Sequence, residues 1–279
     1  MQPVIPSPSQ PLSVNPVWVG DNQAVRLYDY GGSGLPLLFV HGAFGHARVW
    51  DHAITSLGRD LHPFALDLIG HGESDWGANE QRYDFSRLVE DLKKCLAAMP
   101  DKPAVVGHSI GAVLSMMLAA DYADHLSAAA FLDIDPFPPT RQAARLNNIG
   151  QRVPRTFRSR DELQEVVSKG APQASARVRD HLCDHGYRRS GDGFQQRFDQ
   201  RFLRSIRSWD VRGTLPDISI PALLLRGADS TVMTDNGVRD LRSGISQLKF
   251  AAVPSATHQL HLDRPTEVGA AIGDFCRRL

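Results

Sequence analysis

The strongest constraint on the fold is a regular alternation of short apolar runs with segments of helical periodicity. Residues 35–40 form a continuous apolar run, which is typical of a strand buried on both faces of a sheet. Residues 84–98 instead repeat apolar side chains at helical spacing. This alternation predicts an α/β fold, in which a mostly parallel sheet is flanked by helices on both faces.

The same patterns place the other elements of the predicted sheet. We expect eight strands, at residues 17–20, 24–30, 35–40, 61–68, 104–106, 128–134, 222–225 and 248–253. We expect helices at residues 84–98, 112–122 and 265–279, the last with a proline in its first turn.

The alternation stops between Pro136 and Arg212. A Pro-Phe-Pro-Pro stretch at 136–139 begins an arginine-rich, helix-leaning segment without clear strands. We therefore predict a core formed by residues 1–135 and 213–279, with residues 136–212 inserted after the sixth strand as a helical lid. Such a lid would lie over the edge of the sheet where these folds bind ligands.

Composition excludes several classes of protein. The formal net charge is zero, so no global field attracts nucleic acid or an anionic membrane. No apolar stretch of about 20 residues exists to span a membrane. Three scattered cysteines fit neither a disulfide framework nor a zinc site. The proline-containing N-terminus resembles an extended arm or loose tail rather than a signal peptide. We expect a cytoplasmic monomer or homodimer that acts on a small molecule.

One serine stands where the predicted strand 104–106 meets the next predicted helix. Gly107-His108-Ser109-Ile110-Gly111 is a G-x-S-x-G sequence in the strand-to-helix context that a nucleophile elbow requires. The sharp turn strains the backbone and exposes the hydroxyl, so side chains two residues away on either side would collide. Ser109 is therefore the predicted nucleophile.

A serine hydroxyl needs a base, and the base needs an acid that orients it. Asp229 follows the predicted strand 222–225, and His258 follows the strand that ends at Val253. The order Ser, Asp, His is that of the α/β-hydrolases. We predict Asp229 as the acid and His258 as the base, while Asp133 and Asp135 remain alternative acids.

Together these motifs make the chain resemble the α/β-hydrolase superfamily over nearly its whole length outside the lid. His41-Gly42-Ala43-Phe44-Gly45 looks like the oxyanion loop of that family. The resemblance implies that the N–H groups of Ala43 and Ile110 bind the oxyanion. Residues 67–74 resemble the D-x-x-G-H-G-x-S loop of the family, which we interpret as architectural.

Other residues are candidates for binding the substrate. Phe44 and His108 adjoin the predicted oxyanion loop and nucleophile. Arg188 and Arg197 belong to the basic lid, which either forms a solvated surface or lines the entrance for a carboxylate- or phosphate-bearing substrate.

Two further sets of side chains in the lid have simpler explanations. Phe194, Phe198 and Phe202 are expected to pack the lid onto the core. The histidines and cysteine near His181 match no zinc spacing, so no metal and no cofactor is predicted.

The resemblance implies a serine hydrolase that cleaves a small or medium ester, thioester or lactone through an acyl-enzyme on Ser109. Two alternatives remain open, because fold and triad do not select the bond that is cleaved. One is a C–C hydrolase of the meta-cleavage type with the same triad. The other is a slow-turnover ligand receptor or a lyase on the same fold.

Overall fold

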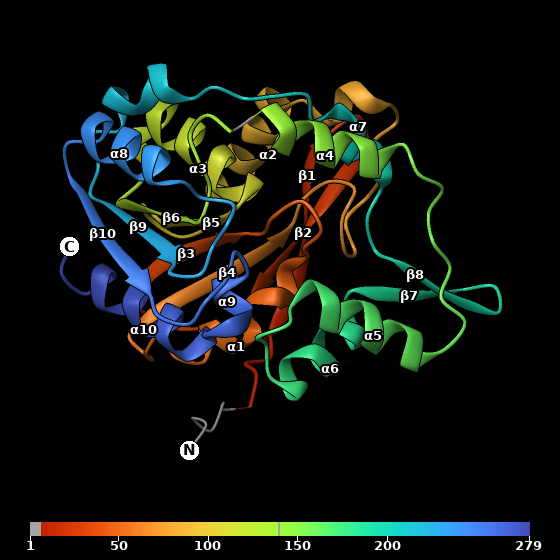
Figure 1. Cartoon of the computed structure of the whole chain (residues 1–279). Helices are drawn as coiled ribbons and strands as arrows, with labels where there is room; N and C mark the ends of the chain where they lie inside the picture. The colour runs from red at the N-terminus through yellow and green to blue at the C-terminus, as the bar shows by residue number, and fades with distance from the viewer. Residues whose placement is uncertain (1–6, 139) are drawn as a thin grey trace.

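An eight-stranded sheet forms the centre of the structure, a computed structural model that describes residues 7–138 and 140–279. The order across the sheet is β1-β2-β4-β3-β5-β6-β9-β10 (Figure 1). The strands are β1 (Ser13–Gly20), β2 (Gln23–Asp29), β3 (Leu35–Val40), β4 (Leu61–Asp67), β5 (Ala104–His108), β6 (Ala128–Leu132), β9 (Ala222–Gly227) and β10 (Leu248–Val253). Within this eight-stranded sheet, the pairs β1–β2 and β2–β4 are antiparallel and the other pairs are parallel. This confirms the predicted mostly parallel sheet.

Helices cover both faces of the sheet. One face carries α2 (Phe85–Ala97), α3 (Ile110–Asp121) and α8 (Asp235–Gly244), and the other carries α1 (Asp51–Ile54), α9 (Leu260–Asp263) and α10 (Pro265–Cys276). Short 3-10 helices complete the connections: η1 (Ala47–Trp50), η2 (Glu80–Tyr83), η3 (Ala123–His125) and η4 (Arg212–Asp217). The predicted helices at 84–98, 112–122 and 265–279 correspond to α2, α3 and α10.

The apolar run at 35–40 explains why both faces need helices. Leu38 and Val40 pack into the core cluster under α2 and α3, whereas Leu37 and Phe39 pack into the cluster under α1 and α10. All four side chains are completely buried. Successive side chains of a strand point to opposite faces, so a strand without polar positions must be covered on both sides.

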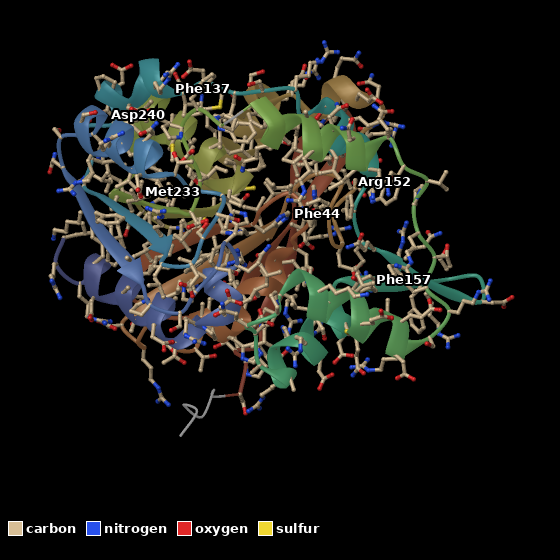
Figure 2. The ribbon with its side chains drawn as sticks, viewed as in Figure 1. Phe44, Phe137, Arg152, Phe157, Met233 and Asp240 are labelled. Atoms are coloured by element: carbon tan, nitrogen blue, oxygen red, sulfur yellow. The ribbon has the colours of Figure 1, made fainter. Side chains whose placement is uncertain are left out.

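The segment between β6 and β9 forms an insertion of helices and one hairpin. It contains α4 (Thr140–Gly150), α5 (Arg160–Gly170), α6 (Ala176–His185), β7 (Tyr187–Ser190), β8 (Gly193–Gln196) and α7 (Gln200–Ser205). We expected no clear strands there, but β7 and β8 pair antiparallel. In Figure 1, α4 and α7 lie together above the strand ends, and α5, α6 and the hairpin lie below. Phe44 of the core lies between these two parts in Figure 2.

Aromatic packing joins the insertion to the core. Phe198 and Phe202 are buried, and both rings contact His71 of the loop after β4. The expected packing role therefore holds for these two phenylalanines. Phe194 differs, because it packs inside the insertion with Phe157, in a small separate cluster.

Most of the arginines near α7 form ion pairs. Arg197 pairs with Glu73, Arg201 with Asp199 and Arg204 with Glu80. Two of these three acids belong to the core loop that precedes α2. The arginines of this stretch therefore attach the insertion to the core instead of forming a free basic rim.

The N-terminal segment, expected to be an extended arm or a loose tail, is in part an extended strand. β1 begins at Ser13 and includes Pro16, which an edge strand tolerates because its outer N–H groups need no partner. Residues 1–6 of the predicted arm, and Pro139 of the proline-rich stretch, lie outside the described residues. Within the described ranges, no helix is long and apolar enough to cross a membrane.

The three cysteines provide a test of this packing. Cys95, Cys183 and Cys276 are buried free thiols, and burial raises the pKa of each above its usual range. Because the thiolate is the reactive form, we expect an aromatic disulfide reagent to modify the native protein orders of magnitude more slowly than the protein unfolded in guanidinium. A thiol that reacts rapidly in the native protein would contradict its burial in this structure.

Candidate active site

Ser109 lies in a strained turn between β5 and α3. Its backbone has φ 54° and ψ −124°, a conformation that a side-chain-bearing residue adopts only when the surroundings impose it. A Cβ on Gly107 would lie 2.2 Å from the carbonyl oxygen of Gly111, and one on Gly111 would lie 2.4 Å from that of Val40. Both glycines are thus required by backbone contacts, as the collision argument predicted.

His258 lies beside Ser109 in the turn after β10. Its Nε2 is 3.1 Å from Ser109 Oγ, and its Nδ1 is 2.8 Å from Asp133 Oδ2. The ring therefore forms hydrogen bonds on both sides, in the geometry that lets an imidazole take a proton from a hydroxyl. His261, three residues later, is buried against His108 and Trp50 and forms neither bond.

The acid beside His258 is Asp133, and the prediction that Asp229 occupies this place is wrong. Asp229 is exposed, and its N–H donates to the carbonyl of Ala256. Its neighbour Ser230 points inward and donates to Asp133 Oδ2 at 2.5 Å. The tight turn after β9 directs Asp229 toward solvent, so the acid comes from the end of β6 instead.

Hydrogen bonds fix the carboxylate of Asp133 in a fully buried position. Oδ1 accepts from the N–H of Gly227 at 2.9 Å, and Oδ2 accepts from Ser230 Oγ and His258 Nδ1. A buried carboxylate needs such donors, because it no longer forms hydrogen bonds with water. Asp133 also has a positive φ of 54°, so Ser109 and Asp133 both occupy strained backbone positions.

Asp135, the other alternative acid, has a structural role. Its carboxylate accepts from the N–H and the hydroxyl of Thr234. Thr234 is the N-cap of α8, and its own Oγ1 accepts from the N–H of Gly237. Asp135 therefore anchors the start of α8 and does not contact His258.

Two buried histidines hold the loop that carries Ala43. His41 Nε2 accepts from the N–H of Leu68 at 3.1 Å, so its Nδ1–H donates to the carbonyl of Gly42 at 2.8 Å. His71 Nε2 donates to the carbonyl of Ala43 at 3.0 Å. Burial lowers the pKa of both histidines below the usual value, which favours their neutral form.

The loop at 67–74 is architectural, as its sequence suggested. The Asp67 carboxylate is buried and accepts from the N–H of Ala47 at 2.6 Å and from the hydroxyl of Tyr28 at 2.9 Å. It also accepts from the N–H of Glu73. Gly72 has a positive φ, and a Cβ there would lie 2.1 Å from the Asp67 carboxyl group. This packing braces the turn that faces the oxyanion loop.

A cavity of about 410 Å³ opens beside Ser109 and His258. The core contributes Ala43, Phe44 and His108, three of the predicted site residues, to its wall. Ile110 begins α3 next to Ser109, and its N–H has no acceptor within the helix. The insertion supplies another part of the wall from α4, α5, α6 and the hairpin.

Two predicted substrate-binding residues do not line this cavity. Arg188 lies over the ring of Trp76, 4.9 Å from its centroid, and Arg197 pairs with Glu73. The arginine that does line the cavity is Arg145 of α4. The sequence contained one signal for this position, because Arg145 lies on the same helical face as the apolar Ile149. Only the docking of α4 shows that this face points toward the cavity.

His181 of the insertion contacts the core. His181 Nε2 lies 3.0 Å from Asp51 Oδ2 and 3.0 Å from the carbonyl of Arg48. Asp51 also accepts from the hydroxyl of Tyr30. Over the described ranges, no group of His, Cys, Asp and Glu side chains has an arrangement that could hold a metal ion.

Comparisons with known proteins found relatives that match most of the chain. The chain is 27% identical over 254 residues to Esterase Rv0045c of Mycobacterium tuberculosis, a match that covers 87% of this chain and 83% of that protein. It is 25% identical over 256 residues to 2-(acetamidomethylene)succinate hydrolase of Mesorhizobium japonicum, with 88% of each covered. The crystal structure of E-2-(acetamidomethylene)succinate hydrolase superimposes with a TM-score of 0.85 at 23% identity, over 95% of this chain and 99% of that one.

A family model provides the assignment. The family model described as the alpha/beta hydrolase family matches residues 37–271, a range that includes Ala43, Ser109 and His258. This chain therefore belongs to the alpha/beta hydrolase family.

Proposed function

We propose that this protein is a serine hydrolase that cleaves a small or medium carboxylic ester, thioester or lactone. The observation that carries the proposal is the chain of hydrogen bonds from Ser109 through His258 to Asp133, which opens onto a cavity. Two relatives support the proposal, because one is named an esterase and the other a hydrolase.

In the proposed mechanism, Ser109 Oγ attacks the substrate carbonyl while His258 Nε2 accepts the hydroxyl proton. Asp133 orients the ring and stabilises the imidazolium that forms. The N–H groups of Ala43 and Ile110 donate to the oxyanion, and each such donor typically lowers the barrier by about 3 kcal/mol. His258 then protonates the leaving group. It next activates a water molecule, which releases the acyl group from Ser109.

The segment 136–212 would act as a lid that determines the substrate. Helices α4, α5 and α6 together wall the cavity opposite the triad, so their side chains contact whatever group extends from the reacting carbonyl. The triad alone does not select the bond. For this reason a C–C substrate of the meta-cleavage type belongs beside esters and lactones in any activity screen.

The first prediction concerns the nucleophile. Ser109→Ala removes the attacking oxygen, so we expect turnover of p-nitrophenyl esters from acetate to octanoate to fall by at least about a thousandfold. The measurement is initial rate across the series for the wild type and the variant. Equal rates in the two proteins would place the chemistry elsewhere.

The second prediction separates the two aspartates. Asp133→Asn keeps the shape of the side chain but removes the acceptor that fixes the histidine tautomer, so kcat should fall by roughly three to four orders of magnitude. Asp229→Asn is the matched control. Because its side chain is exposed and does not contact His258, its kcat should stay within about twofold of the wild type. The reverse pattern would restore Asp229 as the acid.

The third prediction concerns Ser230 as a positioning residue. Ser230→Ala leaves Asp133 Oδ2 with one donor fewer, so kcat should fall by roughly tenfold while KM changes little. Ser230→Thr keeps the hydroxyl and should recover most of the rate. A shifted pH dependence of kcat in Ser230→Ala would show that the effect passes through the acid. An unchanged kcat in Ser230→Ala would remove Ser230 from the mechanism.

A further inference from the structure

The proposed function leaves open which group of the substrate the lid recognises, and the charge of the cavity bears on this. Among the described residues that line it, none is Asp, Glu or Lys, and the single Arg is Arg145. Three lining histidines are neutral in the ordinary pH range, because burial lowers the pKa of His46, His108 and His261. Among the described residues that line the cavity, Arg145 is therefore the only permanently cationic side chain.

Arg145 also differs from the arginines of the following stretch. Arg197, Arg201 and Arg204 each pair with an acid. No acidic side chain in residues 7–138 or 140–279 forms an ion pair with Arg145, and its side chain is exposed. Its guanidinium donors are thus available to a ligand in the cavity.

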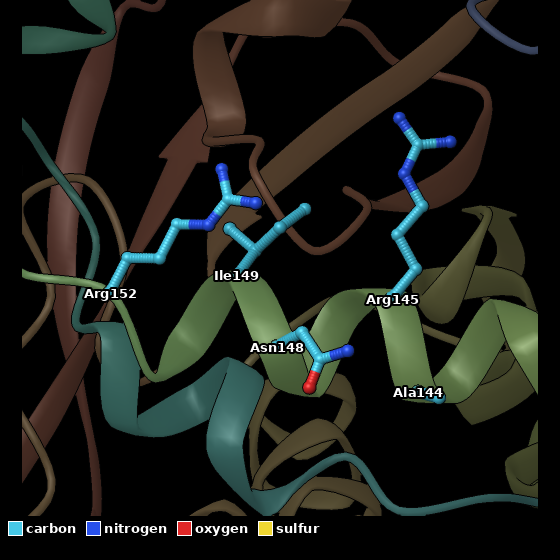
Figure 3. Close-up of a pocket in the computed structure, with 5 residues that line it drawn as sticks. All are labelled: Ala144, Arg145, Asn148, Ile149 and Arg152. Carbon is cyan, nitrogen blue, oxygen red and sulfur yellow. The ribbon is translucent and has the colours of Figure 1, made fainter.

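The docking of α4 fixes the direction of this side chain. Asn147 Nδ2 donates to the carbonyl of Arg204 at 2.7 Å. A Cβ on Gly150 would lie 2.7 Å from the backbone nitrogen of Arg204, so α4 and α7 are in close contact. With the helix held at this rotation, Arg145 and Ile149 project from the same side of α4, as Figure 3 shows.

The surroundings of Arg145 favour one monoanionic group on an apolar chain. Leu146 and Ile149 lie beside it on the cavity wall, and Val166 and Val167 of α5 line the same cavity. The amide side chains of Gln142, Gln196 and Gln259 line the same cavity and are neutral hydrogen-bond donors. One guanidinium balances one carboxylate and binds it through parallel hydrogen bonds. A phosphate dianion would retain an unbalanced charge.

We propose, on the basis of the proposed function, that the substrate carries a free carboxylate in its acyl or leaving part and that Arg145 binds this carboxylate. The substrate class is then an acidic ester, thioester or lactone with an apolar spacer between the carboxylate and the reacting carbonyl. Arg152, which projects from the same side of α4 beyond Ile149 (Figure 3), does not line the catalytic cavity.

The test compares matched esters. Mono-p-nitrophenyl adipate is compared with p-nitrophenyl hexanoate for an acyl carboxylate, and 3-carboxy-4-nitrophenyl hexanoate with the same neutral ester for a carboxylate in the leaving part. For one of the two pairs we expect kcat/KM of the wild type to favour the anionic ester by about tenfold or more. Added salt should reduce this preference.

Variants of α4 assign the preference to one residue. Arg145→Gln should lower kcat/KM for the favoured anionic ester by at least about tenfold and leave the neutral ester within about twofold. Arg145→Lys should retain part of the preference, because the charge remains. Arg152→Gln is the matched control, since it removes an arginine from the same helix face without changing the cavity wall.

Two outcomes would overturn the inference: a wild type that cleaves neutral esters as well as both anionic ones, or an Arg145→Gln variant that loses both ester types equally. A binding measurement separates this failure from failure of the proposed function. Calorimetry with the inactive Ser109→Ala variant should show tighter binding of the anionic ester, and adding Arg145→Gln should abolish the difference. A wild type without turnover whose Ser109→Ala variant keeps this preference would contradict the proposed hydrolase but support Arg145 as the carboxylate site.

Discussion

The buried carboxylate of Asp133 is the interaction on which the geometry of the site depends. It follows β6 directly and accepts hydrogen bonds from Gly227 and Ser230 after β9 and from His258 after β10. A carboxylate without water must find such donors nearby. β6, β9 and β10 are neighbours in the sheet, so Asp133 links the turns that follow them. It thereby holds His258 at 3.1 Å from Ser109 Oγ.

Strain is concentrated at the same place. Ser109 and Asp133 both have φ near 54°, and each such residue costs of order 1–3 kcal/mol. Close packing at the strand ends compensates for this cost. Gly111 contacts the backbone at the end of β3, and Gly227 approaches the carbonyl of Thr257. Because the rigid sheet determines these backbone positions, the two strained residues can stay fixed without a ligand.

The insertion combines two kinds of surface that the sequence does not distinguish. Its arginines near α7 pair with acids and attach the insertion to the core. Arg145 of α4 instead faces the cavity without an acidic partner in the described chain. The basic composition of the insertion therefore does not predict which arginines form ion pairs and which one faces the cavity. The rotation of α4, fixed by its contact with α7, decides which arginine a substrate meets.

The sequence by itself determined the elements whose signals are local. Apolar runs fixed the buried strands, helical periodicity fixed α2, and the glycines around Ser109 fixed the nucleophile turn, because each depends on residues close in the chain. The position of His258 followed for the same reason, since it comes directly after a recognisable strand.

Only the tertiary structure decided which acid faces His258 and which arginine faces the cavity. Asp133 and Asp229 both follow parallel strands at the same edge of the sheet, so their sequence contexts are nearly equivalent. The turn after β9 rotates Asp229 outward and Ser230 inward, and that rotation depends on contacts with residues 253–257. The direction of Arg145 likewise depends on a partner helix far along the chain. Both outcomes arise from packing between distant segments, for which a single sequence carries no local signal.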